Sequence, residues 1–113
     1  MQIRKGTADD LPEIRAISER TIELGCLVED LDETTSIHAR SVIELAVDAF
    51  SASVQSDNHS VYVAARDDNL LGYVIAIHDA PEIRWIVVDP AAQGTGAGKA
   101  LMIAALDALA ERG

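Results

Sequence analysis

The chain has 113 residues, 49% hydrophobic and 25% charged, a composition typical of a single folded domain over residues 1–113 and not of a disordered chain. Its formal net charge of −10 argues against nucleic-acid binding, which needs clustered lysine and arginine, and is compatible with a cationic substrate such as an amine. A single cysteine excludes a disulfide framework or a cysteine metal cluster, and we expect no metal.

The first five residues lack the continuous apolar stretch of a signal peptide. The most apolar later run is interrupted by Asp107, so we expect no membrane-spanning segment. These features together predict a cytoplasmic protein.

The first half of the chain predicts one short strand, over residues 2–5, and two helices. Thr7 or Asp9 can cap the first helix, whose apolar positions have helical spacing: Leu11, Ile14, Ile17, Thr21 and Leu24. An acidic loop over 26–35 leads to a second helix with one apolar face: Ile43, Ala46, Val47, Phe50 and Val54. We expect that helix to end in the polar stretch 51–60.

The second half predicts strands followed by a helix. Residues 60–65 and 70–78 have strand composition and are joined by turn residues, which indicates a hairpin, and 82–88 form another strand. The last helix covers about 96–111, with an expected core face of Leu101, Met102, Ala105, Leu106 and Leu109. The order β-α-α-β-β-β-α predicts an α+β fold with a mixed, mostly antiparallel sheet.

The most informative motif joins the last strand to the last helix. The apolar run 82–88 is followed by Pro90 and then by glycines at 94, 96 and 98. Glycine lets the backbone approach a ligand closely, and the first amides of a helix have no intrahelical acceptor. Together with the helix dipole, these free N–H groups suit a phosphate or pyrophosphate. The alternative is a tight strand-to-helix turn that holds no ligand.

Two common phosphate-binding loops do not fit this spacing. The P-loop of nucleoside triphosphatases needs Gly-x-x-x-x-Gly-Lys-Ser/Thr. Gly98 and Lys99 are present, but Gln93 occupies the first glycine position and Ala100 the hydroxyl position. The dinucleotide fingerprint GxGxxG lacks its third glycine from either starting point, and the chain ends before a ribose-binding acid could follow.

The segment Gln93–Gly98 resembles the Q/R-x-x-G-x-G/A acyl-CoA pyrophosphate loop of the GNAT superfamily of N-acetyltransferases. Ile86–Pro90, just before it, resembles the end of that family's fourth strand. The resemblance covers nearly the whole chain and implies a GNAT-like acyl-CoA N-acyltransferase fold. It also implies direct transfer of an acetyl group from acetyl-CoA to a primary amine of a small molecule or peptide.

The family's further C-terminal strands, and the tyrosine that many members use as general acid, have no match in this sequence. We therefore expect a C-terminally short version of the fold. The alternative function is a catalytically incomplete acyl-CoA-binding or regulatory module. An interaction domain whose glycine turn is purely structural is a third hypothesis.

The resemblance also implies which residues hold acetyl-CoA. Backbone groups of Ile86, Val87 and Val88 are expected to pair with the pantetheine arm, unless that strand forms an ordinary ladder with a neighbour. The pyrophosphate is expected on the loop and the first turn of the helix: Gln93, Gly94, Thr95, Gly96, Ala97, Gly98 and Lys99.

Glu82 is the candidate general base, because its offset from Gln93 resembles that of the glutamate base in some family members. A solvated glutamate is the alternative, in which case Asp79, His78 or a water would remove the proton. The aromatic side chains of the strands are expected to pack in the core: Tyr62, Tyr73 and Trp85.

A sheet that stops at 82–88 would expose a long apolar edge strand, and such edges pair readily with another chain. We therefore expect either a homodimer formed through this edge or a fragment whose missing strands cover it. Pairing with a second chain would occupy the groups expected to bind pantetheine.

Overall fold

The computed structural model describes residues 1–26, 33–67, 69–79, 81–92 and 94–112, with the side chains of 21–42 and 112 outside this description. Its elements are β1 (Gln2–Lys5), η1 (Ala8–Asp10), α1 (Leu11–Cys26), α2 (Glu33–Val54), β2 (His59–Arg66), β3 (Asn69–Ile77), β4 (Glu82–Val88), η2 (Pro90–Ala92) and α3 (Ala97–Arg112). This order confirms the predicted α+β arrangement and adds two short 3₁₀ turns. None of the described helices is long and apolar enough to cross a membrane.

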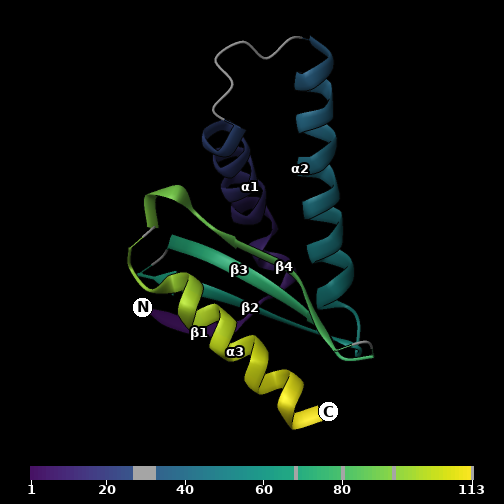
Figure 1. Cartoon of the computed structure of the whole chain (residues 1–113), viewed down its shortest axis with the longest axis vertical. Helices are drawn as coiled ribbons and strands as arrows, with labels where there is room; N and C mark the ends of the chain where they lie inside the picture. The colour runs from purple at the N-terminus through teal and green to yellow at the C-terminus, as the bar shows by residue number, and fades with distance from the viewer. Residues whose placement is uncertain (27–32, 68, 80, 93, 113) are drawn as a thin grey trace.

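The described strands form one sheet in the order β1-β2-β3-β4, and each of its pairings is antiparallel. The parallel pairing implied by a mixed sheet does not occur among these strands. Helices α1 and α2 run side by side on one face of the sheet, and α3 crosses the other face (Figure 1). The chain therefore has three layers, with the sheet in the middle.

Two apolar clusters fill the spaces between these layers. Alternation along the strands separates them, since successive side chains point to opposite faces of a sheet. The first joins α1 and α2 to the sheet: Ile14, Ile17, Phe50, Val61, Val63, Leu70, Tyr73 and Ile75. The second joins α3 to the sheet: Ala64, Val74, Ala76, Ala97, Leu101 and Ala105. The central strand β3 contributes to both clusters.

The predicted apolar face of the second helix is confirmed, but the helix is longer than expected. It begins at Glu33, inside the predicted acidic loop, of which residues 27–32 lie outside the description. It ends at Val54, within the polar stretch where its end is expected. Packing explains this last turn, because Ser53 is buried and Val54 packs against the first cluster.

The predicted core face of the last helix is wrong at one residue, Leu106. Leu106 is 52% exposed, whereas Ala108 is 5% exposed and faces the sheet. At 3.6 residues per turn, Leu106 lies about 140° around the helix from Leu101, the centre of the buried face. The spacing from Leu101 through Ala105 to Ala108 keeps small side chains against the strands.

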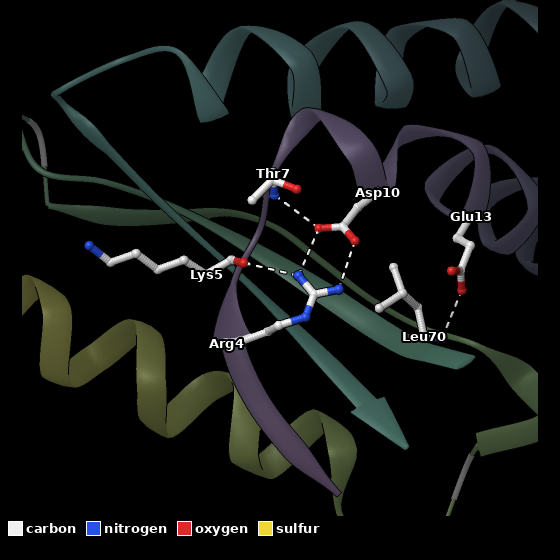
Figure 2. Close-up of polar contacts among 6 residues, drawn as sticks. All are labelled: Arg4, Lys5, Thr7, Asp10, Glu13 and Leu70. Atoms are coloured by element: carbon white, nitrogen blue, oxygen red, sulfur yellow. Dashed lines mark hydrogen bonds and ion pairs between the residues drawn. The ribbon is translucent and has the colours of Figure 1, made fainter. Parts of the chain in front are cut away.

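Polar contacts tie η1 and α1 to the sheet (Figure 2). Arg4 of β1 donates hydrogen bonds of 3.0 and 2.8 Å to the carboxylate of Asp10, which also accepts the backbone N–H of Thr7 at 2.9 Å. The hydrogen bond from Arg4 lowers the pKa of Asp10, although burial acts in the opposite direction. Glu13 of α1 accepts the backbone N–H of Leu70, in β3, at 2.9 Å.

Gly72 of β3 is required by the close approach of β4. A Cβ atom at this position would lie 2.5 Å from the carbonyl oxygen of Val87 and 3.1 Å from the Cα of Val88. Because both are backbone atoms, we expect Gly72→Ala to lower the free energy of unfolding by roughly 1–3 kcal/mol, measured by urea denaturation.

Gly98→Ala is the matched control. Its Cβ would meet only the Cγ2 of Val88, at 3.3 Å, and alanine favours a helix. If Gly72→Ala were as stable as Gly98→Ala, close packing of β3 against β4 would not be the reason for this glycine.

Candidate cofactor-binding site

Asp89 directly follows β4 and starts the turn that leads to α3. Its backbone N–H donates to the carbonyl of Leu71 at 2.7 Å, which completes the pairing with β3. Its Oδ1 accepts the N–H of Ala91 at 3.0 Å, and its carbonyl accepts the N–H of Ala92 at 2.8 Å, closing η2. Asp89 is only 6% exposed, so this turn is anchored in the protein and not loose at the surface.

The loop after η2 depends on Thr95 and on two glycines. The N–H and the hydroxyl of Thr95 both donate to the carbonyl of Ala92, at 3.2 and 2.6 Å, and the hydroxyl oxygen accepts the N–H of Ala97 at 3.3 Å. Gly94 and Gly96 have φ values of +84° and +86°, and nothing lies within 4 Å of a Cβ built on either. These two glycines are needed for backbone conformation and not for lack of space.

Gly98 has a different role from the other two glycines. Its φ lies outside the left-handed region, and a Cβ there would lie 3.3 Å from the Cγ2 of Val88. The absence of a side chain at this position lets the first turn of α3 pack closely on the end of β4.

Unpaired amides border a hollow beside this loop. The backbone N–H groups of Gly94, Gly96, Gly98 and Lys99 have no acceptor among the described residues, and the first helical bond runs from the N–H of Ala100 to Gly96. The hollow has a volume of about 290 Å³ and is lined by Val88, Ala92, Gly94, Gly96, Ala97, Gly98 and Lys99. Free N–H groups at the positive end of a helix dipole make this a suitable place for an anion.

The structure thus brings together most of the residues predicted to hold the pyrophosphate. Thr95 closes the loop through its hydroxyl, Ala97 is buried at 1% exposure under the loop, and Lys99 is exposed at the rim of the hollow. Gln93 lies outside the described residues.

The pairing of β4 with β3 decides which of its backbone groups are open. The N–H of Asp89 bonds to Leu71, and Val87 lies opposite Tyr73. Because bonded and non-bonded pairs alternate in an antiparallel ladder, the backbone groups of Val87 face β3, and those of Ile86 and Val88 face away. The backbone contact expected from Val87 is therefore corrected, because its N–H and carbonyl face β3, whereas Ile86 and Val88 direct theirs to the outer edge of β4.

A β-bulge at Arg84 was not predicted. Trp85 lies opposite Ile75, and Ile83 lies opposite Ala76, so Arg84 has no partner in β3. The extra residue moves Ile83 onto the face of α3, whereas Trp85 packs on the opposite face against the first cluster. The alternation Ile-Arg-Trp would place Ile83 and Trp85 on one face, so the sequence pattern carried no signal for the bulge. Bulges often occur on edge strands near active sites.

Glu82 is the first residue of β4, lies opposite Ile77 and is exposed. Six further residues of β4 follow Glu82 before the turn, a span of roughly 20 Å. The two alternative bases lie at the same end of the sheet, just after β3. Asp79 is exposed, and the Nε2 of His78 lies 2.7 Å from the hydroxyl of Ser60.

The expected packing of the aromatic residues is confirmed. Tyr73 is fully buried, its ring meets that of Phe50 edge-on at 5.6 Å, and burial raises the pKa of its hydroxyl. Trp85 packs against the first cluster and Tyr62 against the second.

Comparison with known proteins places this geometry in a family. The model of the acetyltransferase (GNAT) family matches residues 25–113. The chain belongs to this family, which confirms the resemblance seen in the glycine loop. No curated protein gives a match.

Solved structures with the same fold support the assignment. A PaiA N-acetyltransferase from Thermoplasma acidophilum in complex with coenzyme A has 18% identity and a TM-score of 0.78, covering 97% of this chain and 72% of that chain. A GNAT family acetyltransferase from Brucella melitensis in complex with acetyl-CoA has 25% identity and a TM-score of 0.68, covering 99% and 70%. A GCN5-related N-acetyltransferase from Rhodopseudomonas palustris has 20% identity and a TM-score of 0.75, covering 98% and 66%. The chain thus spans 66–72% of the length of these structures.

The left-handed conformation of Gly96 is the easiest feature of the loop to test. A β-branched residue is strained at a φ of +86°, at a cost of roughly 1–2 kcal/mol or more, so we expect Gly96→Val to distort the loop. Coenzyme A affinity, measured by titration calorimetry, should fall about tenfold or more, since 1.4 kcal/mol corresponds to a factor of ten.

Ala91→Val is the control for this variant. It adds the same side chain at an exposed position of η2 that does not line the hollow. A folded Gly96→Val protein that bound coenzyme A as tightly as Ala91→Val would show that the anion is held elsewhere.

Proposed function

We propose that the chain is an acetyl-CoA-dependent N-acetyltransferase that moves an acetyl group directly to a primary amine of a small molecule or peptide. The observation that carries this proposal is the row of amides before and within the first turn of α3 that have no acceptor in the described part of the chain, beside a hollow of about 290 Å³. Membership of the GNAT family supports it. So do the two related structures that contain coenzyme A or acetyl-CoA.

Two adjacent features would hold acetyl-CoA. The pyrophosphate would accept hydrogen bonds from the free amides of Gly94, Gly96, Gly98 and Lys99. The pantetheine arm would follow the outer edge of β4, where Ile86 and Val88 present unpaired backbone groups. An extended arm lying along this edge would bring the thioester toward the bulge and the start of the strand.

The chemistry needs orientation and removal of a proton. The ammonium form of the acceptor first gives a proton to a base, and the free amine nitrogen then attacks the thioester carbonyl carbon. The carbon–sulfur bond breaks, and coenzyme A leaves as a thiolate that takes up the second proton of the attacking nitrogen. Glu82 is our candidate for that base, because it lies on the strand that would carry the thioester and is open to solvent. The acidic surface is compatible with a cationic acceptor, given a net charge of −10.

The competing function is a binding module that retains the glycine loop and binds acetyl-CoA but does not catalyse acetyl transfer. Titration calorimetry with acetyl-CoA, followed by measurement of thiol release over a panel of primary amines, separates the two. Binding with amine-dependent release supports the enzyme, and binding alone supports the module. Absence of both would mean that the glycine loop is structural.

The role of Glu82 can be tested by Glu82→Gln, which removes the base but keeps the size of the side chain. We expect kcat at neutral pH to fall about 10²–10⁴-fold, with partial recovery as the pH rises and free amine becomes available. The Kd for acetyl-CoA should stay unchanged.

Asp79→Asn is the matched control, because this exposed carboxylate lies at the same end of the sheet. An unaltered kcat in Glu82→Gln together with a loss in Asp79→Asn would move the role to Asp79. Unaltered kcat in both variants would leave His78 or a water molecule as the base.

We also propose that the outer edge of β4 pairs with a second copy of the chain when no cofactor occupies it. Ile86 is 38% exposed on this edge strand, and open edges favour strand pairing. Light scattering should show a dimer that shifts toward monomer on addition of acetyl-CoA, and Ile86→Lys should weaken the dimer. Leu106→Lys, at a 52% exposed position of α3, is the control. A monomer at every protein concentration without ligand would contradict this proposal.

A further inference from the structure

We infer that Arg20 of α1 is a positioning residue for the cofactor loop, and that it acts through Asp89. This inference rests on the proposed function, because it assigns the loop a ligand. The two partners of the contact, Arg20 and Asp89, lie 69 positions apart in the sequence.

The contact joins a buried carboxylate to an exposed guanidinium. The Nε and Nη2 atoms of Arg20 both donate to Oδ2 of Asp89, at 3.0 and 2.5 Å. The side chain of Asp89 is 9% exposed, and that of Arg20 is 47% exposed. The other carboxylate oxygen, Oδ1, accepts the N–H of Ala91, so both oxygens of Asp89 are used.

A continuous series of hydrogen bonds leads from Asp89 to the free amides. The carbonyl of Asp89 accepts the N–H of Ala92, and the carbonyl of Ala92 accepts both donors of Thr95. The hydroxyl oxygen of Thr95 then accepts the N–H of Ala97, at the start of α3. Fixing the carboxylate of Asp89 therefore fixes the direction of the loop that carries the unpaired N–H groups.

Charge gives a second reason for the pair. Burial acts to raise the pKa of Asp89, but the hydrogen bonds from Arg20 and Ala91 and the charge of Arg20 lower it below its usual range. Asp89 is therefore an anion at neutral pH, placed just before a site that would bind a second anion. Arg20 compensates this charge, so the loop gains the geometry that Asp89 imposes without repelling a pyrophosphate.

A second ion pair on the same helix supplies the control. Arg15 of α1 donates to Glu44 of α2 from an exposed position, and neither residue lines the hollow. The variant Arg15→Met breaks this pair and removes one positive charge from α1, as Arg20→Met does.

Coenzyme A affinity is the first measurement. Arg20→Met keeps the apolar stem, Arg20→Lys keeps the charge but not the paired donors, and Asp89→Asn keeps an acceptor for Ala91. We expect Arg20→Met and Asp89→Asn to weaken binding on the order of tenfold, and their double variant to lose no more than either single. Arg20→Lys should fall between, and Arg15→Met should bind as the parent does.

Amide hydrogen exchange is the second measurement and needs no ligand. In Arg20→Met the amides of Ala92 and Thr95 should exchange faster, on the order of tenfold, while that of Gly6, bonded to Val61 in β2, should not change. Circular dichroism melts of the three arginine variants check that the fold persists.

The two measurements separate this inference from the proposed function. If the parent failed to bind coenzyme A, the proposed function would be wrong, but faster exchange at Ala92 and Thr95 would still support positioning by Arg20. Unchanged exchange at both amides in Arg20→Met would overturn the inference. So would coenzyme A binding by that variant with the affinity of the parent.

Discussion

Burial of β3 on both of its faces is the constraint on which the other elements depend. Tyr73 and Ile75 need cover from one side, and Val74 and Ala76 need it from the other. Helices α1 and α2 supply the first cover, so the chain must return to the opposite face after β4 to supply the second with α3 (Figure 1). The loop proposed to bind the cofactor is the connection that makes this return.

That loop is built mostly from backbone, and this has a chemical consequence. The groups that would face a pyrophosphate are N–H donors whose direction is set by Gly94, Gly96 and the hydroxyl of Thr95. The proposed site suits a strongly acidic protein, because it would depend on nearby dipoles and not on net charge. The pairing of Arg20 with Asp89 acts at the same short range, since it neutralises the one buried carboxylate in this turn.

The sequence by itself determined the class of fold and the place of the candidate site. Periodic apolar positions predicted the order of helices and strands, because burial of a face leaves a local pattern of period 3.6 or 2. The spacing of glycines at 94, 96 and 98 identified the loop, because a left-handed or closely packed backbone restricts residue type at that position. Such local requirements depend on neighbouring residues and can be recognised from the sequence alone.

The tertiary structure decided everything that depends on pairing between distant segments. Whether Val87 or Ile86 presents open backbone groups follows from the register of β4 on β3, and the bulge at Arg84 reverses a face that alternation alone assigns wrongly. The contact of Arg20 with Asp89 joins two ordinary surface-type residues that no local pattern connects. Register and long-range contacts result from the packing of whole layers against one another. They can therefore be determined only from the tertiary structure.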